Sequence, residues 1–297
     1  MRCGFVTIAG KPNAGKSTLI NQLVGEKVSI VSWRPQTTRD KITGVVNGDG
    51  FQVVFIDTPG LHNSQNKLGE FMMKSVDAAL KDIDALLYVV NAEKGIDRFD
   101  EQFLAAHLGR NVPVIVAVNK IDKATRESLF EQLQRLSQFS EIMSIIPISA
   151  KKGDGVDEVL KQLVDFMPEG EPAFPEDIYT DKSMRFMAAE IIREKALKLL
   201  EKEIPYGIGV TVNKFEMRED GLLYSISADI VCEKDTHKPI IIGKQGAMLK
   251  KIATEARLDI EEMVGCKVFL ELWVRVKEDW RDNDYLLNEL GYNKKDI

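Results

Sequence analysis

The stretch "FVTIAGKPNAGKSTLI" (residues 5–20) contains the pattern that decides the fold of this chain. Its centre, Gly10–Ser17, matches G-x-x-x-x-G-K-[S/T] between an apolar run of strand length and a helix-like segment. The glycines let backbone N–H groups fold around phosphate oxygens, and the start of the helix adds a positive dipole end. Lys16 can reach the β- and γ-phosphates, and the Ser17 hydroxyl can bind Mg²⁺. An accidental glycine-rich turn is the alternative, but the strand–helix context favours a phosphate-binding loop.

The alternation of strand-like and helix-like runs continues through the first half of the chain. Apolar runs occupy residues 5–10, 53–57, 85–91, 112–120 and 145–149, and helix-like stretches lie near residues 16–24, 66–81, 98–109, 125–138 and 155–167. Such alternation builds a mostly parallel sheet with helices on both faces. Within 44–56, Asn47–Gly50 separates two strand-like halves and indicates an antiparallel hairpin. We therefore predict an α/β domain with a mixed six-stranded sheet and five helices.

A change of composition after Met167 marks a second region. Residues 168–183 are rich in proline and acidic residues, which is typical of a linker or wrapping segment. Helix-like and strand-like runs then follow in the order 184–203 (helix), 207–218 and 222–233 (strands), 240–260 (helices with a glycine-containing break), 266–277 (strand) and 282–290 (helix). We predict a first domain over 1–167, a linker over 168–183 and an α+β domain over 184–297.

The composition excludes several classes of protein. At 297 residues and 44% hydrophobic content, the chain is long enough for two domains with their own cores. No stretch approaches the roughly 20 uninterrupted apolar residues that span a bilayer, and the first residues are typical of a strand rather than a signal peptide. Three scattered cysteines, Cys3, Cys232 and Cys266, favour a reducing compartment, so we expect a cytoplasmic protein. The formal net charge of −6 disfavours coating of bulk nucleic acid but allows a local basic site.

Two further segments carry residues suited to a phosphate and its metal ion. In "QVVFIDTPGLHNS" (residues 52–64), Asp57 closes a strand where its carboxylate can hold Mg²⁺ through a water, and Gly60 lets a backbone N–H approach the γ-phosphate. In "RPQTTRDK" (residues 34–41), a threonine can complete the magnesium shell and hold the loop in the triphosphate state. We favour Thr38 over Thr37, although both threonines are also compatible with a solvated loop.

The residues at two later strand ends indicate which base is bound. In "NKID" (residues 119–122), Asp122 can accept from guanine N1–H and the exocyclic amine, a donor pair that adenine lacks. Asn119 can bond from the other edge of the base, and the stem of Lys120 can lie along it. In "SAK" (residues 149–151), a backbone N–H can serve guanine O6. Four motifs in this order, each at the carboxyl end of a strand, predict a guanine-nucleotide site.

The predicted site has three overlapping sets of residues. The nucleotide-binding set is Gly10, Lys11, Pro12, Asn13, Ala14, Gly15, Lys16, Ser17, Thr18, Asp57, Thr58, Pro59, Gly60, Asn119, Lys120, Asp122, Ser149, Ala150 and Lys151. The catalytic set is Lys16, Thr38, Asp57 and Gly60, and the Mg²⁺ set is Ser17, Thr38 and Asp57.

A second motif lies in the predicted α+β domain. Residues 243–246, Gly-Lys-Gln-Gly, fit the G-x-x-G loop with which KH domains clamp a single-stranded backbone, although a plain turn between helices matches this short pattern too. The order of elements matches the KH variant whose helix precedes the sheet, and residues 236–254 contain four lysines and no acidic residue. Residues 240–242, Ile-Ile-Ile, suit either the core or an apolar groove for unstacked bases. The predicted RNA-binding residues are Ile241, Ile242, Gly243, Lys244, Gln245, Gly246, Lys250 and Lys251.

These motifs carry a family resemblance. With "GKPNAGKS", "TTRD", "DTPG", "NKID" and "SAK", residues 1–167 resemble the Ras-like P-loop GTPase domain of the translation-factor class. With "IIIGKQGAMLKKI" and "ELWVRVKEDWRDN" in a type II KH domain, nearly the whole chain resembles the bacterial Era family of GTPases. The resemblance implies binding to single-stranded RNA near the 3′ end of 16S ribosomal RNA and a role in assembly of the small (30S) ribosomal subunit. It also implies peripheral association with the inner face of the cell membrane, though the sequence shows no clear amphipathic anchor, and we expect a monomer.

The expected reaction is in-line attack of water on the γ-phosphate, with Lys16, loop N–H groups and Mg²⁺ neutralising the developing charge. Leu61 stands where many GTPases have a glutamine that orients this water, and leucine forms no hydrogen bond through its side chain. Backbone groups, the loop 62–70, a cation or a bound partner must therefore place the water, and we expect slow hydrolysis that RNA stimulates. In related GTPases an asparagine at the place of Asn13 helps to hold K⁺. The alternative is an asparagine that only tolerates an unusual loop conformation.

Three functional classes are compatible with these features. A switch protein would use the nucleotide to set its RNA affinity, and slow hydrolysis would act as a timer. A dedicated catalytic enzyme, such as a tRNA-modification GTPase, would need a further catalytic cysteine or cofactor domain, which the sequence does not show. A signalling GTPase without RNA would require the KH interpretation to be wrong. The switch interpretation is the one that uses both domains.

Overall fold

The computed structural model describes residues 1–62, 64, 66–109, 111–219 and 221–293. Contacts within the chain define two compact units. The first comprises Met1–Val31, Thr38–Asn63 and Met72–Asp181, and the second comprises Ser32–Thr37, Ser64–Phe71 and Lys182–Ile297. Each unit has its own hydrophobic core. Among the described residues, no helix is both long enough and apolar enough to cross a membrane.

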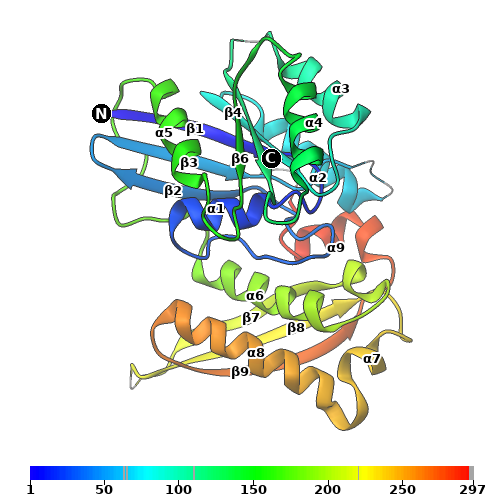
Figure 1. Cartoon of the computed structure of the whole chain (residues 1–297). Helices are drawn as coiled ribbons and strands as arrows, with labels where there is room; N and C mark the ends of the chain where they lie inside the picture. The colour runs from blue at the N-terminus through cyan, green and yellow to red at the C-terminus, as the bar shows by residue number, and fades with distance from the viewer. Residues whose placement is uncertain (63, 65, 110, 220, 294–297) are drawn as a thin grey trace. The chain divides into compact units, whose positions relative to one another are not determined.

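The first half of the chain forms the predicted α/β fold (Figure 1). Its elements are β1 (Arg2–Ala9), α1 (Lys16–Val24), β2 (Ile42–Gly48), β3 (Phe51–Asp57), α2 (Lys67–Ala79), β4 (Ala85–Asn91), α3 (Arg98–His107), β5 (Val114–Asn119), α4 (Arg126–Leu136), β6 (Ile142–Ile148) and α5 (Val156–Phe166). The six strands have the order β2-β3-β1-β4-β5-β6. Only β2 is antiparallel to its neighbour, β3, so the predicted hairpin and the mixed sheet are confirmed.

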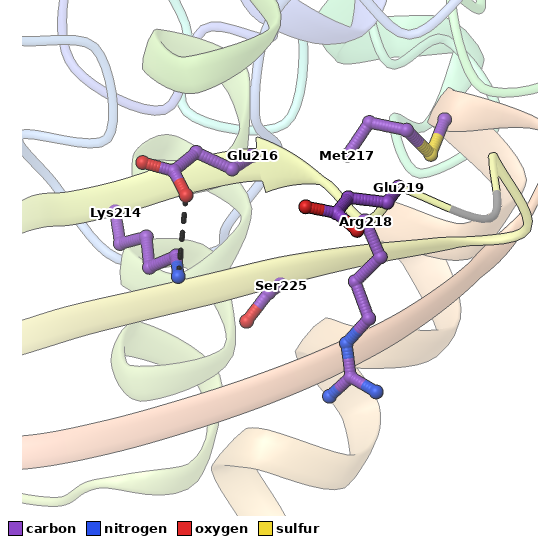
Figure 2. Close-up of a pocket in the computed structure, with 6 residues that line it drawn as sticks. All are labelled: Lys214, Glu216, Met217, Arg218, Glu219 and Ser225. Carbon is purple, nitrogen blue, oxygen red and sulfur yellow. Dashed lines mark ion pairs between the residues drawn. The ribbon is translucent and has the colours of Figure 1, made fainter.

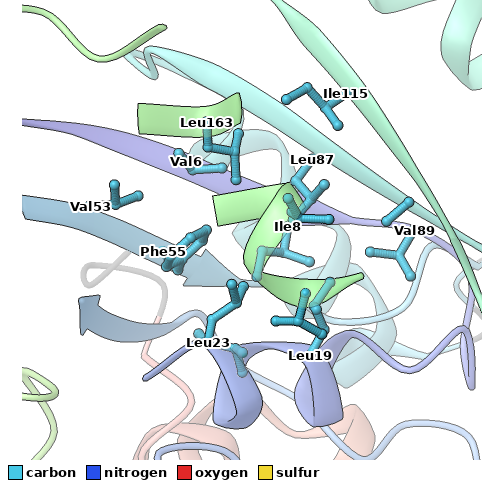
Figure 3. Packing of buried hydrophobic residues seen from close by; sticks show 14 of the residues in the cluster. Val6, Ile8, Leu19, Leu23, Val53, Phe55, Leu87, Val89, Ile115 and Leu163 are labelled. Atoms are coloured by element: carbon cyan, nitrogen blue, oxygen red, sulfur yellow. The ribbon is translucent and has the colours of Figure 1, made fainter. Parts of the chain in front are cut away.

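Both faces of this sheet are covered, because the parallel strands are apolar on both sides. On one face, α1 and α5 pack against strand residues such as Ile8 and Phe55, as Figure 3 shows with Leu19 and Leu163. On the other face, α2, α3 and α4 contribute Val76, Leu104 and Leu136 to a second cluster, which also contains Leu61. β4 and β5 are buried at every position. A rigid sheet therefore supports the loops that leave its edge.

The register of the sheet brings the predicted motifs to one edge. Asp57, the last residue of β3, pairs with Ile8 near the end of β1. Asn119, the last residue of β5, pairs with Asn91 of β4 and with Ile148 of β6. Because parallel strands share a direction, the loops after their carboxyl ends meet at this edge, where α/β folds bind ligands.

The proline-rich segment that follows α5 wraps along strands of the first unit. Cys3 donates its backbone N–H to the Pro168 carbonyl at 2.9 Å, and Gln52 Nε2 donates to the Phe174 carbonyl at 2.8 Å. The Val45 N–H likewise donates to the Tyr179 carbonyl at 2.8 Å. The segment up to Asp181 therefore belongs to the first compact unit.

The second unit contains the predicted order helix, strand, strand, helix, helix, strand. Its elements are α6 (Met184–Leu199), β7 (Gly209–Met217), β8 (Leu223–Cys232), α7 (Lys238–Ile242), α8 (Ala247–Val264), β9 (Lys267–Val276) and α9 (Asp284–Glu289). The sheet has the order β7-β8-β9, with β8 antiparallel to β7 and parallel to β9. The helices α6 and α8 lie along this sheet (Figure 1). Their side chains share a core with it. Residue 220, in the predicted turn between β7 and β8, lies outside the described residues.

The helix predicted over 184–203 is shorter than expected. α6 ends at Leu199, and a 3₁₀ turn (Ile204–Gly207) follows it. Pro205 is the second residue of this turn, and Lys202 has a positive φ of 54°. Proline lacks a backbone N–H and disfavours helical geometry at the residue before it, so the α-helix cannot continue through this segment. The pattern of apolar residues that predicted the helix extends beyond its actual end.

Candidate guanine-nucleotide site and RNA-binding loop

The phosphate loop is held in shape by its own lysine. Lys16 is 6% exposed, and its Nζ donates to the carbonyls of Gly10 at 2.9 Å and Lys11 at 3.2 Å. Burial lowers the pKa of Lys16 to about 8, while the charge of Asp57 acts in the opposite direction. An ammonium in this position gains from the approach of an anion, because added negative charge favours its protonated form.

Three predicted magnesium residues converge at the end of β3. The hydroxyls of Ser17 and Thr38 lie 2.9 Å apart, and they donate to Asp57 Oδ2 at 2.9 Å and 3.2 Å. Asp57 is fully buried, and its other oxygen, Oδ1, has no hydrogen-bond partner among the described residues. Burial raises the pKa of Asp57, although Lys16 and the hydroxyl donors oppose this. Thr37 differs from Thr38, because its hydroxyl donates to the Arg34 carbonyl at 2.8 Å.

Ser29 is a member of this cluster that the sequence analysis missed. Its side chain is fully buried, and its hydroxyl donates to Asp57 Oδ2 at 2.9 Å. Asn21 of α1 holds Ser29 in place, because Asn21 Oδ1 accepts the Ser29 N–H at 2.9 Å. Ser29 belongs to no motif, so only its spatial neighbours reveal its contact with the carboxylate.

The turn after β3 packs directly on the phosphate loop. A Cβ added at Gly60 would lie 2.7 Å from the backbone N and Cα of Pro12, so no larger residue fits without a shift. The Thr58 hydroxyl donates to the Ile8 carbonyl at 2.8 Å, and the Leu61 N–H donates to the Gly10 carbonyl at 3.2 Å. The turn and the loop are therefore joined through their backbones.

Leu61 and His62 occupy different environments. The Leu61 side chain is 5% exposed and lies in the apolar cluster that contains Val76 and Tyr88. The His62 ring makes a 2.7 Å hydrogen bond between Nδ1 and the Gly60 carbonyl. This bond requires a proton on Nδ1, and the buried Nε2 has no hydrogen-bond partner among the described residues. In the loop 62–70, residues 63 and 65 lie outside the described part of the chain.

Asn119 joins three motifs. Its Nδ2 donates to the Ala14 carbonyl of the phosphate loop at 2.9 Å, and its Oδ1 accepts N–H groups from Lys120 at 2.7 Å and from Ala150 at 3.0 Å. A Cβ added at Gly15, whose φ is 101°, would lie 2.2 Å from Asn119 Nδ2, so this approach requires glycine. Asn119, a predicted contact of the base, therefore also joins the loops.

The lysine and aspartate of the same motif differ in exposure. The half-buried Lys120 has a positive φ of 69°, and its Nζ donates to the Asn13 carbonyl at 2.6 Å. Burial lowers the pKa of Lys120. The Asp122 carboxylate is exposed and accepts from the Ser149 hydroxyl at 2.8 Å, which lowers its pKa. Asp122 therefore stays ionised, as an acceptor for two guanine donors must. The buried Ala150 and the exposed Lys151 complete this edge.

Asn13 has a positive φ of 62° in the phosphate loop. Asparagine tolerates this left-handed conformation better than most residues do, so this observation favours the conformational alternative for Asn13. It leaves the potassium interpretation as a prediction.

The G-x-x-G loop joins α7 to α8 in the second unit. Gly243 has φ 75° and ψ 173°, and a Cβ there would lie 2.8 Å from the backbone N of Met248. Lys244, Gln245, Lys250 and Lys251 are exposed. At Gly246, by contrast, an added Cβ would meet no atom within 4 Å. Positively charged groups thus stand beside a loop whose backbone is open to approach at Gly246, as binding to a sugar-phosphate chain requires.

The structure places one residue of the predicted RNA-binding set, Ile241, in the core. Ile241 is fully buried in the core that α6, α8 and the sheet share, so its side chain is not available to RNA. Its neighbour Ile240 is 52% exposed, and Ile242 is partly buried. Successive residues of a helix are rotated by about 100°, so adjacent isoleucines of α7 face different sides, which an unbroken apolar run does not reveal.

Comparison with known proteins decides the family. A model described as a 50S ribosome-binding GTPase matches residues 5–120, and a KH domain model matches residues 203–281. The GTPase Era of Clostridium kluyveri is 48% identical over 292 residues, which cover 98% of this chain and 99% of that relative. The GTPase Era of Clostridium botulinum is 48% identical over 293 residues and covers 99% of both. The chain belongs to the Era family of GTPases.

Two solved Era structures have the same fold over the full length. Aquifex aeolicus Era, as a single-residue variant bound to GDP.AlF4⁻, has a TM-score of 0.95 and 40% identity, with 99% of this chain and 100% of that one covered. Era in complex with MgGDPNP and nucleotides 1506–1542 of 16S ribosomal RNA has a TM-score of 0.94 and 40% identity, with 99% of both chains covered. The predicted Ras-like domain followed by a KH domain is therefore confirmed, and the chain, like other Era proteins, is a GTPase.

A surface pocket on the KH sheet of this Era family member lies outside the predicted RNA-binding set. Figure 2 shows its lining on β7, β8 and the turn between them: Lys214, Glu216, Met217, Arg218, Glu219 and Ser225. Lys214 and Glu216 form an ion pair of 3.2 Å. This pairing within the lining leaves the lysine-rich G-x-x-G loop as the stronger candidate for contact with phosphates.

Proposed function

We propose that this chain is a GTP-hydrolysing switch that binds single-stranded RNA near the 3′ end of 16S ribosomal RNA and acts in assembly of the small ribosomal subunit. The observation that carries the proposal is the likeness, over 99% of both chains, to an Era solved with MgGDPNP and that RNA segment. The exposed lysines beside the G-x-x-G loop support it. GTP and RNA are then the two ligands whose binding is coupled.

The nucleotide chemistry assigns a role to each element of the phosphate end. Lys16 and the loop N–H groups would stabilise charge that develops on the γ-phosphate during in-line attack by water. Ser17, Thr38 and Asp57 would hold Mg²⁺. Asp57 Oδ1, which no group of the described residues contacts by a hydrogen bond, and the adjacent hydroxyls are oxygen ligands of the kind that this ion prefers. The ion, when bound, would supply charge neutralisation at the phosphates. The backbone N–H of Gly60 would donate to the γ-phosphate, and this contact would be lost on hydrolysis.

The base end would select guanine over adenine. Asp122 is held by Ser149 and kept ionised, so it offers two acceptor oxygens to N1–H and the exocyclic amine. Adenine offers no such pair and would leave the carboxylate covered and unpaired. Asn119, with Lys120 and Ala150, would keep the base loops and the phosphate loop at a constant separation.

RNA binding is tested with a labelled single-stranded RNA of the sequence of 16S nucleotides 1506–1542, titrated with protein in a GTP analogue and in GDP. We expect tighter binding in one nucleotide state than in the other, and weak binding of a scrambled RNA of equal length. Absence of binding in both states would refute the RNA switch. Equal binding of the scrambled RNA would refute the 3′-end target. Crosslinking and sequencing of RNA from cells would then identify the natural segment.

A potassium ion beside Asn13 is a separate part of the proposal. Exchange of Na⁺ for K⁺ should raise the rate of GTP hydrolysis, and Asn13→Ala should remove the difference, because K⁺ would add positive charge where other GTPases use an arginine. Single-turnover hydrolysis in each salt at constant ionic strength measures this. Equal rates of the unmodified protein in both salts would leave only the conformational role of Asn13.

Location and oligomeric state complete the proposal. We propose a cytoplasmic monomer that associates peripherally with the inner face of the cell membrane. Sedimentation at micromolar concentration tests the monomer. Flotation with anionic and neutral vesicles tests the membrane contact, and protein that stays at the bottom of both gradients would exclude it.

A further inference from the structure

Lys11, the second residue of the phosphate loop, joins this loop to the start of α3. Its Nζ lies 2.5 Å from Asp97 Oδ2 and 2.7 Å from Asp100 Oδ2. Although burial acts in the opposite direction, the two carboxylates raise the pKa of Lys11 above its usual value. At the same time, the Lys11 carbonyl accepts from Lys16 Nζ at 3.2 Å and from the Ala14 N–H at 3.3 Å. One residue therefore connects α3 to the turn that holds the phosphate-binding lysine.

Asp100 is the fixed end of this connection. Its side chain is 3% exposed, whereas that of Asp97 is 63% exposed. Asp100 Oδ1 accepts from the Tyr88 hydroxyl at 2.8 Å, and Oδ2 accepts from the Asp97 N–H at 2.9 Å as well as from Lys11. Burial raises the pKa of Tyr88, so its hydroxyl stays protonated and donates. Tyr88 is fully buried in β4 and stacks on Phe103 with ring centroids 4.8 Å apart. The carboxylate is thus immobilised by groups of the rigid sheet and helix.

The connection from α3 reaches the point where the backbone of the phosphate loop contacts the turn after β3. The Gly10 carbonyl, adjacent to Lys11, accepts from Lys16 Nζ at 2.9 Å and from the Leu61 N–H at 3.2 Å. A shift of residues 10 and 11 would therefore move both the phosphate-binding ammonium and the turn that contains Gly60. Small displacements of groups that align a reaction have large effects on rate, and a shift of about 1 Å can cost about a hundredfold.

We propose that Asp100 is a positioning residue for GTP hydrolysis, which acts through Lys11 to fix the start of the phosphate loop. Asp100 does not touch the nucleotide in this role. The proposal rests on the GTPase activity and is independent of RNA binding. A capping role alone would not need Lys11, because the Asp97 carboxylate and the Asp100 side chain already satisfy the first N–H groups of α3.

The test compares Asp100→Asn with Asp97→Asn in the full-length protein. Both substitutions remove one negative charge next to Lys11 and keep an acceptor for capping. We expect Asp100→Asn to lower the single-turnover rate of GTP hydrolysis at saturating Mg²⁺ by about 5- to 20-fold, with less than about a threefold change in the Kd of a GTP analogue. Asp97→Asn should change the rate by less than about twofold, because the exposed carboxylate leaves the Asp100–Lys11 pair in place.

A double-mutant cycle keeps the proposal falsifiable if a buried unpaired lysine or aspartate impairs folding. The double variant Lys11→Met, Asp100→Asn leaves no unpaired charge in the buried part of the cluster, because the Asp97 carboxylate that also loses Lys11 is 63% exposed. Its rate should equal that of the slower single variant, since Lys11→Met, Asp100→Asn and the double variant all remove the same connection. Thermal unfolding of each variant gives the folded fraction. The proposal fails if Asp100→Asn hydrolyses GTP within twofold of the unmodified protein, if Asp97→Asn is equally slow, or if the loss follows the unfolded fraction alone. It also fails if the effects of Lys11→Met and Asp100→Asn on the rate multiply.

Discussion

At the scale of single residues, Leu61 and His62 show how the site differs from GTPases that use a glutamine. Leu61 stabilises the apolar cluster beneath the turn and donates only its backbone N–H to the phosphate loop. The ring of His62 is fixed by the Gly60 carbonyl, and its Nε2 lies in a buried position. In the turn that contains Gly60, polar groups are therefore supplied by the backbone and by the ring of His62. The side chain of Leu61 contributes only packing.

The burial of Leu61 leads to a prediction about Leu61→Gln. This substitution would place an amide in an apolar cluster, and it should lower the free energy of unfolding by about 1–3 kcal/mol. The basal hydrolysis rate should not rise, because a side chain directed into the core does not reach the water. Denaturant unfolding and single-turnover hydrolysis measure the two effects. A marked rise in rate with unchanged stability would show that the side chain at position 61 turns toward the nucleotide.

The lowered pKa of Lys16 leads to a second prediction. In the nucleotide-free protein, Lys16 loses its proton as the pH rises through about 8, whereas bound phosphate favours the charged form. The affinity for a GTP analogue should therefore fall above pH 8, by at most about tenfold per pH unit, and binding there should take up a proton. Calorimetry in buffers of different ionisation enthalpy measures this uptake, below the pH at which guanine itself ionises. A Lys16→Gln variant should bind weakly and show no such uptake near pH 8.

At the scale of elements, the helix α8 and the G-x-x-G loop before it combine an open backbone with exposed lysines. Lys250 and Lys251 lie in the first turns of α8 and are exposed, whereas the face with Ile252, Ala256 and Ile260 is buried against the sheet. The helix therefore serves the core with one face and can serve an anionic ligand with its first turns. Packing in the core and binding of an anionic ligand therefore use different residues of α8.

Replacement of both lysines by alanine should weaken RNA binding without a change in sequence preference. On a single strand each phosphate contact contributes about 0.7 to the slope of log K against log salt, so Lys250→Ala, Lys251→Ala should reduce this slope by about 1.4. Lys214→Ala, Lys267→Ala is the matched control, since these exposed lysines lie on strands β7 and β9 and not beside the loop. Binding isotherms at several salt concentrations give the slopes. A similar loss in the control would indicate an effect of net charge alone.

At the scale of the whole molecule, the chain combines two compact units with separate cores, one with the guanine motifs and one with the KH motif. Coupling between their ligands is a thermodynamic quantity and does not depend on a particular arrangement of the units. If both ligands bind one chain, each must alter the affinity of the other by the same factor. A switch requires this factor to differ between GTP and GDP.

The mutual effect of RNA and nucleotide on each other's affinity can be measured from both sides. If a GTP analogue raises RNA affinity by some factor relative to the nucleotide-free protein, saturating RNA should raise the affinity for that analogue by the same factor. Fluorescence titration of a labelled nucleotide, with and without RNA, measures one side of the cycle, and RNA titration measures the other. A factor of one on both sides would mean two independent binding modules in one chain.

Much of this protein was predictable because its decisive signals are local in sequence. A phosphate loop between a strand and a helix, "DTPG" after a strand and "NKID" after another each contain both the residue type and its structural setting. The parallel sheet then brings these strand ends together by a general rule of α/β folds. The type II KH order also followed from the succession of apolar periodicities. Fold, base and family were therefore accessible from the residues alone.

Tertiary structure alone decided which side chains those motifs use and which partners they have. Ser29 reaches Asp57 across 28 positions of sequence, and Lys11 reaches Asp100 across 89. Leu61 and Ile241 both proved to be buried, although their neighbours His62 and Ile240 are polar or exposed. Periodicity predicts an average face of an element, but contacts between elements depend on register, packing and the few ångströms that separate loops. The chemistry of the site was therefore readable from its motifs, whereas the contacts that hold the site in position depend on residues that meet only in the folded chain.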